Sequence, residues 1–334
     1  MTTKTETATN ETMVTADAAA REVAQRILDG RRFLITSHRN PDGDALGSSL
    51  ALQGLARKLG KEATVIVRDF FSGPLHSIPG AEGVIVTDRL PTDYPQNYDA
   101  MFTMECPEHE RTGFPVLPGP VVNIDHHLGN TMYGEINYLD LEAPSVGEMV
   151  MRVNGTLGVP LDPDIATAIY VSLATDTGFF RYTNTTLRAF EAATTLVRAG
   201  ADPGKISLLI NESQSPASMK LLGLCLNSME FFSGAKIAAI ELPRRFFSES
   251  GATPEDTEGI VNYGRTIDGV LVSVLLKEVE GGSRVSMRAK PDVDVQAVAA
   301  IFGGGGHKAA SGCFVPLPID EAKKKLLGIL KEIV

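Results

Sequence analysis

The chain has 334 residues, of which 43% are hydrophobic and 22% are charged, a globular composition that is long enough for one large domain or two smaller ones. Its 31 basic and 41 acidic residues give a formal charge of −10, which argues against a protein that coats long nucleic acid, because such proteins are usually basic. No run of about 18 apolar residues occurs, so we expect neither a transmembrane helix nor a membrane partner.

The first 17 residues are polar and rich in threonine. They lack the basic start and apolar centre of a signal peptide, so we expect a disordered tail over residues 1–17 and a cytoplasmic protein. Three cysteines, Cys106, Cys225 and Cys313, are far apart in the chain. They form neither a metal motif nor a disulfide framework, which fits a reducing compartment.

The first half of the chain alternates between strand and helix patterns. A helix is expected over residues 18–29, a buried strand over 32–37, and a second helix over 45–59 after a polar loop. Further strands are expected over residues 62–69, 83–87, 100–105 and 121–125. This alternation favours a parallel sheet with helices on both faces, in which ligands bind at the carboxyl ends of the strands.

The pattern becomes mostly helical after residue 145 and returns to strands near Lys236. Helices are expected over residues 146–157, 163–174, 186–198, 206–211, 216–230, 254–263, 295–301 and 319–332. Residues 269–290 are typical of a hairpin that turns at Gly281 and Gly282. The sequence therefore predicts an α/β fold with a parallel-sheet domain over 18–205, a helical linker over 206–235 and a smaller α/β domain over 236–334.

Polar residues gather directly after the first strand, in the segment SHRNPDGDALGSS. His38, Asp42 and Asp44 supply one imidazole and two carboxylates within seven residues. This mostly oxygen ligand set suits Mn²⁺ or Mg²⁺ better than a metal that prefers thiolates. On local grounds alone, a solvated turn with a helix cap is the alternative.

Further candidate ligands follow later strands and one helix. They are Glu105 at the end of a strand, Asp125, His126 and His127 after the next strand, and Asp176 at a turn after an apolar helix. Strand ends point such side chains into the crevice of a parallel sheet. Taken singly, the histidine pair could be structural, Glu105 an exposed acid at a strand end and Asp176 an ordinary turn aspartate.

A glycine-rich segment, FGGGGHKAASG, lies near the C-terminus. Four consecutive glycines let the backbone approach a ligand closely and point N–H groups at an anion, and a helix starting after them would add a favourable dipole. A flexible hinge is the alternative. The segment is neither a P-loop nor a dinucleotide fingerprint.

Together and in this order, the motifs resemble the DHH phosphoesterase superfamily, in the branch with a DHHA1 C-terminal domain. The matching positions are Asp125, His126 and His127; His38, Pro41, Asp42, Gly43, Asp44, Gly47 and Ser48; and Gly303, Gly304, Gly305, Gly306, His307, Ala309, Ala310 and Gly312. The resemblance covers roughly residues 20–330. It is nearest to the stand-alone oligoribonuclease type, which degrades very short RNA and removes the 3′-phosphate of adenosine 3′,5′-bisphosphate.

The resemblance implies two Mn²⁺ ions, for which Mg²⁺ is the alternative. By this resemblance His38, Asp42 and Glu105 hold one ion, and the other is held by Asp44, Glu105, His126 and Asp176. His127 and Asp125 are then the catalytic residues, with His127 orienting ligands or touching a phosphate oxygen. Most of the family has Asp where this chain has Glu105. The bridging role of Glu105 between the two ions is therefore the assignment to test.

The resemblance also implies that the second domain binds the substrate. The family's substrate-binding positions are matched by Arg288 and by the segment of Gly303, Gly304, Gly305, Gly306 and His307. Strand periodicity places Arg284 and Lys290 on the same face as Arg288, where a solvated face is the preferred interpretation for both. Arg111, in the loop after Glu105, is an outside candidate for contact with a phosphate.

Three other functions stay open on the sequence. A cyclic di-AMP or linear dinucleotide phosphodiesterase shares the same motifs. A non-catalytic nucleotide- or RNA-binding protein would fit a decayed metal site at Glu105, although the other expected ligands argue against decay. An inorganic pyrophosphatase is disfavoured by the glycine-rich motif, and a homodimer is neither required nor excluded.

Overall fold

The computed structural model describes residues 3–334 except 72, 213, 258 and 291, with side chains described for these residues except 3–15, 255 and 307. The chain divides into two compact units, Met1–Ser213 and Gln214–Val334. The division falls within the linker predicted over residues 206–235. Among the described residues, no helix is both long and apolar enough to cross a membrane.

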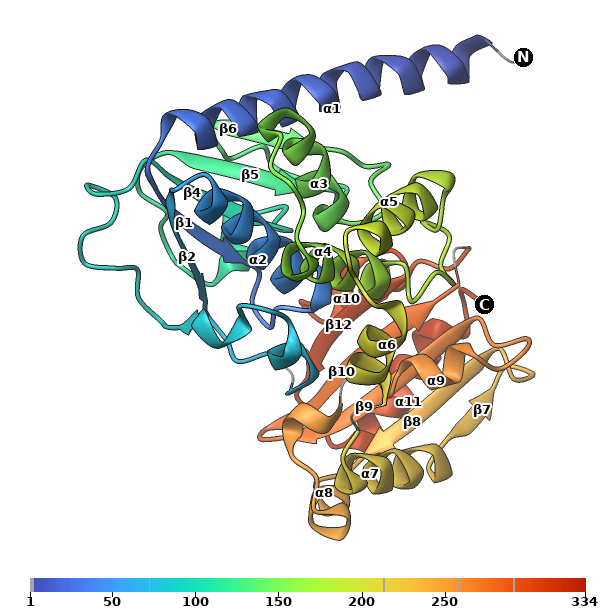
Figure 1. Ribbon diagram of the computed structural model, residues 1–334. Helices are drawn as coiled ribbons and strands as arrows, with labels where there is room; N and C mark the ends of the chain where they lie inside the picture. Colours follow the sequence, from blue (N-terminus) through green and yellow to red (C-terminus); the bar gives the residue numbers. More distant parts are fainter. Residues whose placement is uncertain (1–2, 72, 213, 258, 291) are drawn as a thin grey trace. The chain divides into compact units, whose positions relative to one another are not determined.

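The first unit is built on a six-stranded sheet in which every pair of neighbouring strands is parallel. In sheet order, the strands are β3 (Ile85–Val86), β2 (Glu62–Val67), β1 (Arg32–Ser37), β4 (Ala100–Met104), β5 (Val121–Asp125) and β6 (Ile136–Leu139). Its α-helices are α1 (Thr3–Asp29), α2 (Gly43–Lys58), α3 (Val146–Leu157), α4 (Pro163–Asp176), α5 (Leu187–Arg198) and α6 (Pro203–Asn211) (Figure 1). The predicted parallel sheet is confirmed.

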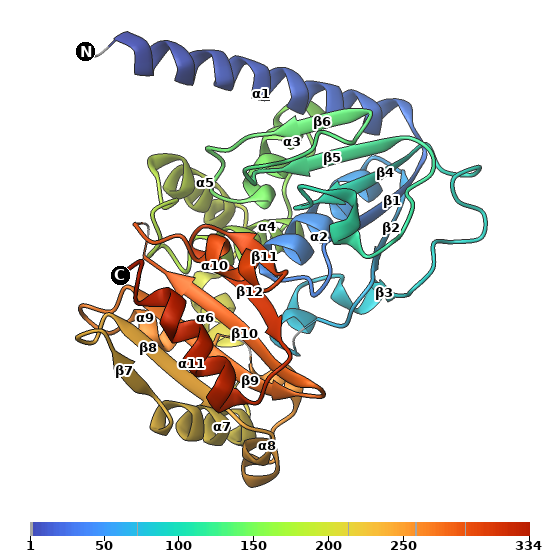
Figure 2. The same ribbon diagram turned by 180° about the vertical axis from the view of Figure 1, so that it is seen from behind.

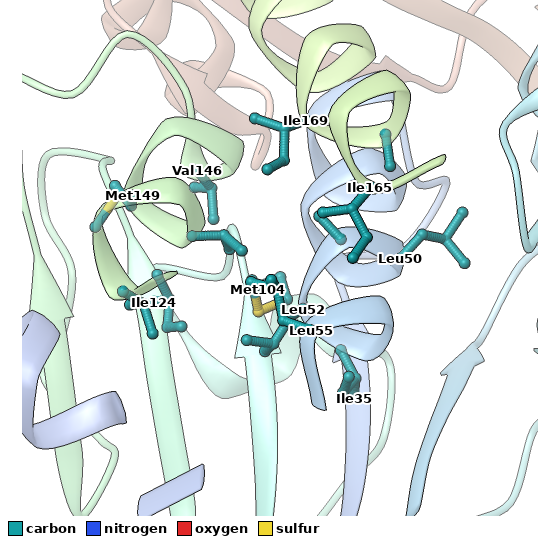
Figure 3. Close-up of a cluster of buried hydrophobic side chains, with 14 of the residues drawn as sticks. Ile35, Leu50, Leu52, Leu55, Met104, Ile124, Val146, Met149, Ile165 and Ile169 are labelled. Atoms are coloured by element: carbon teal, nitrogen blue, oxygen red, sulfur yellow. The ribbon is translucent and has the colours of Figure 1, made fainter. Parts of the chain in front are cut away.

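The two faces of this sheet are covered differently. One face packs against apolar side chains of α1 to α4 in a single hydrophobic cluster, part of which is drawn in Figure 3, where Met104 of the sheet lies beside Leu52 and Leu55 of α2. The other face, which includes Leu34, Ile66 and Met101, packs against Tyr94 and Phe114, which lie outside any described α-helix. The expectation of helices on both faces was therefore wrong, because aromatic loop residues bury the second face instead.

Helix α1 begins at Thr3, whereas the sequence predicted a disordered tail as far as residue 17. Its buried side chains recur at helical spacing, with Ala20, Val23, Ala24 and Ile27 all packed in the core. Packing begins before residue 18, because Ala16 is also buried and Asp17 forms an ion pair with Arg152 on α3. These contacts explain why the helix continues upstream of its predicted start.

The second unit has a mixed six-stranded sheet in which only β8 and β9 are parallel neighbours. In sheet order, its strands are β11 (Gly305–His307), β12 (Ala310–Val315), β10 (Gly282–Ala289), β9 (Val272–Val279), β8 (Ile237–Leu242) and β7 (Glu230–Phe232). Its α-helices are α7 (Pro216–Asn227), α8 (Arg245–Ser250), α9 (Asn262–Arg265), α10 (Val295–Ile301) and α11 (Ile319–Leu330). Helix α11 lies across the face seen in Figure 2, and α7 lies on the opposite face.

The predicted hairpin is confirmed, because β9 and β10 pair antiparallel around Gly281. The predicted linker helices instead belong to the two units: α6 packs through Ile206 in the first core, and α7 packs through Leu221 and Cys225 in the second. Residues 254–263 form a short 3-10 helix at Pro254–Thr257 followed by α9, not one helix. The three cysteines are free and buried.

Candidate metal centre

The predicted ligands gather where β1, β4 and β5 end at the centre of the parallel sheet. His38 directly follows β1, Glu105 directly follows β4, and His126 directly follows β5. Along the sheet, the strand order runs away from β1 toward β3 on one side and away from β4 toward β6 on the other. Such a reversal of connections opens a crevice at the carboxyl ends of the strands, where α/β proteins bind their ligands.

His38, Asp42 and Glu105 form the first group, whose potential ligand atoms lie within 4.8 Å of one another. His38 Nε2 lies 3.4 Å from Glu105 Oε2 and 3.8 Å from Asp42 Oδ1. Nδ1 of His38 lies 2.8 Å from the Arg39 carbonyl oxygen. Because a carbonyl can only accept, this contact assigns the proton to Nδ1 and leaves the Nε2 lone pair for a metal ion.

Asp42 is at the same time the N-cap of α2, and its Oδ1 accepts hydrogen bonds from the backbone N–H groups of Asp44 and Ala45, each at 3.0 Å. The helix cap and the ligand cluster, which were alternative interpretations of this segment, therefore coexist. Through Oδ1, the cap fixes the Asp42 carboxylate beside His38.

Asp44, Glu105, His126 and Asp176 form the second group, also within 4.8 Å. His126 Nε2 lies 3.7 Å from Asp44 Oδ2 and 3.8 Å from Asp176 Oδ2. The other ring nitrogen of His126 lies 3.0 Å from the Ala143 carbonyl oxygen, so this histidine too is held with Nε2 toward the carboxylates. Asp176 is the last residue of α4 and not a turn residue after it.

Glu105 belongs to both groups, and to a third with His126 and His127. Glu105 is 4% exposed, and its Oε2 is buried with no hydrogen-bond partner. Its backbone has φ of 60°, a left-handed conformation that costs a non-glycine residue about 1–3 kcal/mol and that clusters at functional sites. A buried, unsatisfied carboxylate oxygen shared between two ligand groups fits a bridging ligand.

The carboxylates of the two ligand groups repel one another. Burial, with Asp42 and Asp44 nearby, raises the pKa of Glu105 well above its usual range. Burial and Asp44 raise the pKa of Asp176 to about 7. Burial lowers the pKa of His126, but Asp176 and Asp44 outweigh that effect and raise it to about 9. Two divalent ions would supply the charge that these carboxylates require, so the donor set fits such ions.

Asp125 lies outside the three ligand groups and orients His127 instead. It is fully buried, its Oδ1 lies 2.8 Å from His127 Nδ1, and its Oδ2 accepts a hydrogen bond from Asn130 at 2.7 Å. This pairing turns His127 Nε2 toward Glu105 Oε1, 3.9 Å away. Asn130 was missed by the sequence analysis, as was Asn184, which donates to Asp176 Oδ2 at 3.0 Å.

Arg111 lies in the 3-10 helix His109–Thr112 after Glu105 and is exposed. Its carbonyl oxygen accepts a hydrogen bond from the Arg39 N–H at 2.7 Å. Since the Arg39 carbonyl in turn contacts His38, the main chain places Arg111 near the first ligand group. No described contact assigns its guanidinium to a phosphate.

In the second unit, the glycine-rich segment follows α10 and continues into β11 and β12. The helix expected after the glycines is absent from this described segment, so the predicted dipole contribution was wrong. A Cβ on Gly304 would lie 2.2 Å from the Gly312 carbonyl oxygen, whereas one on Gly303 or Gly305 would meet nothing within 4 Å. Gly304 is therefore required for strand packing, while Gly303 and Gly305 leave open space.

Arg288 lies on β10 beside this segment. Its Cα pairs with Ala310 on β12, which pairs in turn with His307 on β11. Directly opposite residues of antiparallel strands share a face, so the structure brings the Arg288 and His307 positions into one row. The side chain of His307 lies outside the described residues. The alternation predicted along β10 is confirmed, because Val285 and Met287 are buried between partly exposed neighbours.

Two family profiles match the chain: the DHH family, N-terminal domain, over residues 32–173 and the DHHA1 domain over residues 234–334. The bifunctional oligoribonuclease and PAP phosphatase NrnA of Thermus thermophilus is 31% identical over 313 residues, which cover 89% of this chain and 89% of the relative.

Two solved structures resemble the whole chain. The crystal structure of an exopolyphosphatase-related protein from Bacteroides fragilis has a TM-score of 0.87 at 27% identity, over 94% of this chain and 97% of that chain. A crystal structure of the exonuclease RecJ bound to manganese shares the fold, with a TM-score of 0.50 at 14% identity over 95% of this chain and 93% of that chain.

Proposed function

This chain is a phosphoesterase of the DHH family with a DHHA1 domain, and from that premise we propose that it hydrolyses very short oligoribonucleotides and the 3′-phosphate of adenosine 3′,5′-bisphosphate. The observation that carries the proposal is the buried Glu105 carboxylate shared between two groups of metal-ligand candidates. The similarity to a bifunctional oligoribonuclease and PAP phosphatase supports this choice of substrates.

We assign His38, Asp42 and Glu105 to one Mn²⁺ ion, and Asp44, Glu105, His126 and Asp176 to the other. Bound there, two divalent ions would supply the positive charge that stabilises the attacking and leaving oxygens of a phosphoryl centre. His127, oriented by Asp125, is placed to hold a phosphate oxygen of the substrate or to give a proton to the leaving oxygen.

Water is the nucleophile that these side chains favour. Cys106 lies next to Glu105 but is fully buried, and its Sγ lies 3.3 Å from the Met104 carbonyl oxygen. Burial raises the pKa of its thiol well above the usual range, whereas a nucleophilic cysteine needs a lowered pKa and access to the substrate.

A panel of substrates tests the proposal directly. Metal-free protein, supplied with Mn²⁺ or Mg²⁺, should release mononucleotides from pApA and from RNA of a few residues, and orthophosphate from adenosine 3′,5′-bisphosphate. Excess chelator should abolish all of these activities, because the ions would supply the charge that activates water and stabilises the phosphoryl oxygens. Liquid chromatography of the products gives the measurement.

The same panel of substrates also tests the alternative functions. Hydrolysis of cyclic di-AMP faster than pApA would favour a cyclic dinucleotide phosphodiesterase. Binding of these compounds without turnover under any metal condition would instead favour the non-catalytic nucleotide- or RNA-binding protein.

We predict that Arg288→Ala raises KM for pApA by about 10- to 100-fold, because a charged hydrogen bond to phosphate is worth about 1.5–3 kcal/mol. The turnover number and the bound Mn²⁺ should change little, since no group of candidate metal ligands lies among the described residues of the second unit. Steady-state kinetics with metal analysis of the purified variant measure both quantities.

Arg284→Ala is the matched control, because Arg284 lies on the same strand and face but is exposed and pairs with Phe314, away from the glycine-rich segment. It should leave KM unchanged. Loss of bound Mn²⁺ with unchanged KM in Arg288→Ala would contradict the proposal that the first unit binds the metal ions and the second unit binds the substrate.

A further inference from the structure

Asp44 is held by hydrogen-bond donors from two other helices of the first unit. The hydroxyl of Ser172 on α4 donates to Asp44 Oδ1 at 2.5 Å. At the N-terminus of α3, the N–H of Val146 donates to Oδ2 at 2.8 Å and that of Gly147 to Oδ1 at 3.2 Å. Asp44 is 1% exposed and Ser172 is 0% exposed, so water does not compete for these bonds.

The donors divide unequally between the two carboxylate oxygens. Each oxygen has about two lone pairs, so the two donors at Oδ1 saturate it, whereas Oδ2 has one donor and keeps one acceptor site. Oδ2 is also the oxygen that lies 3.7 Å from His126 Nε2 in the second ligand group. Asp44 therefore presents one oxygen, Oδ2, to a metal ion.

Ser172 also joins the elements that carry the ligands. It precedes Asp176 by four residues on α4, so the two side chains lie one turn apart on the same helix face. Its oxygen accepts the Gly147 N–H at 2.9 Å and lies 3.1 Å from the hydroxyl oxygen of Ser145, the N-cap of α3. One hydroxyl thus links α3 and α4 to the Asp44 side chain of α2.

Glycines bring the three helices close enough for these bonds. A Cβ on Gly147 would lie 2.1 Å from Ser172 Oγ, and a Cβ on Gly47 would lie 2.5 Å from the Ala168 carbonyl oxygen. Side chains at either position would push α3 or α2 away from α4. The close packing therefore fixes Ser172 in reach of Asp44 Oδ1.

We propose that Ser172 is a positioning residue for the ion of the second ligand group, because it occupies Asp44 Oδ1 and holds Oδ2 toward that ion. This inference rests on the proposed two-metal function. Groups that hydrogen-bond to metal ligands fix their orientation, and removing one typically weakens metal affinity by about 10- to 100-fold. The site of His38, Asp42 and Glu105 has no such contact with Ser172 among the described hydrogen bonds and should keep its affinity.

Titration of the metal-free protein with Mn²⁺ by calorimetry tests this inference. The unmodified protein should bind two ions, and Ser172→Ala should weaken one of the two sites by about 10- to 100-fold while the other is unchanged. Ser172→Cys keeps a similar volume but has only a weak donor, so it should behave like Ser172→Ala. Ser49→Ala is the control, because Ser49 is equally buried but donates only to the Ala45 carbonyl oxygen at 2.6 Å, and it should bind both ions normally.

Unchanged Mn²⁺ affinity in Ser172→Ala would overturn the inference. Restored affinity in Ser172→Cys would overturn it too, since packing and not hydrogen bonding would then explain the Mn²⁺ affinity. Equal weakening of both sites, together with a lowered unfolding temperature of the metal-free protein, would also overturn it. Two bound ions without hydrolysis of any nucleotide in the panel would contradict the proposed substrates and leave the role of Ser172 standing.

Discussion

Asp44→Ala is expected to lower turnover of pApA by about 1,000-fold, equivalent to about 4 kcal/mol in the activation barrier. The substitution removes the Oδ2 ligand of the second group and with it the charge that binds the ion. Glu105, His126 and Asp176 remain, so the affinity for one Mn²⁺ should fall while the other ion stays bound. Turnover measured at saturating substrate, with metal content determined in parallel, checks both effects.

The variant must also be shown to fold, because removal of the carboxylate leaves the Val146 N–H without its acceptor, whereas the Gly147 N–H keeps Ser172 Oγ and the Ser172 hydroxyl keeps Ser145 Oγ within reach. Each buried donor left unsatisfied costs about 1–3 kcal/mol, whereas the loss of a charge beside Glu105 relieves repulsion. Asp164→Ala, in the exposed first turn of α4, is the control and should keep full activity. A folded Asp44→Ala protein that hydrolyses pApA normally in excess chelator would exclude the two-metal mechanism.

Three of the ligand candidates could be found from the sequence because they directly follow strands. His38, Glu105 and His126 each come immediately after a buried strand, and the carboxyl ends of parallel strands meet at one edge of the sheet. Once the strands were placed, topology alone required these side chains to converge. Their assignment to ions in the sequence analysis came from the family resemblance, not from their spacing.

The residues that hold the ligands could not be found in this way. Ser172, Asn130 and Asn184 contact their targets across long stretches of chain or from within irregular segments. A serine inside an apolar helix and an asparagine in a loop have ordinary local explanations, so no pattern distinguishes them. The role of Ser172 follows only from how α2, α3 and α4 pack together, and the roles of Asn130 and Asn184 follow from how the segments after β5 and α4 fold back on Asp125 and Asp176.

The aromatic residues that cover the second face of the parallel sheet could not be predicted for a related reason. Helical periodicity identifies amphipathic helices, but Tyr94 and Phe114 lie outside the described α-helices and reach the sheet from irregular segments, where no periodicity exists to detect. Likewise, four consecutive glycines carry no signal for a strand, yet Gly305 and Gly306 pair with β12. Tertiary contacts override local propensity at such positions.

Glu105→Gln is the second substitution with a large expected effect, a loss of at least one bound Mn²⁺ and about 1,000-fold in turnover. The amide keeps the size of the side chain but removes the negative charge shared by the two ligand groups. The same change should stabilise the metal-free protein, because burial and the charges of Asp42 and Asp44 oppose an ionised Glu105. We therefore expect an unfolding temperature at or above that of the unmodified metal-free protein, which scanning calorimetry measures.

Glu105→Asp is the more discriminating change, because it introduces the residue that the family resemblance led us to expect but shortens the side chain by one methylene. His38 Nε2 is 3.4 Å from Oε2 and His127 Nε2 is 3.9 Å from Oε1, so a shorter carboxylate moves away from both histidines at once. The backbone has little freedom to follow, because the Glu105 N–H donates to the Ile124 carbonyl oxygen at 3.0 Å and φ is already 60°. A misplacement of about 1 Å costs about 100-fold in rate, so turnover should fall between that of the unmodified protein and that of Glu105→Gln. Turnover equal to or above that of the unmodified protein would show that the site is not built around the longer side chain, and full Mn²⁺ binding by Glu105→Gln would show that another residue bridges the ions.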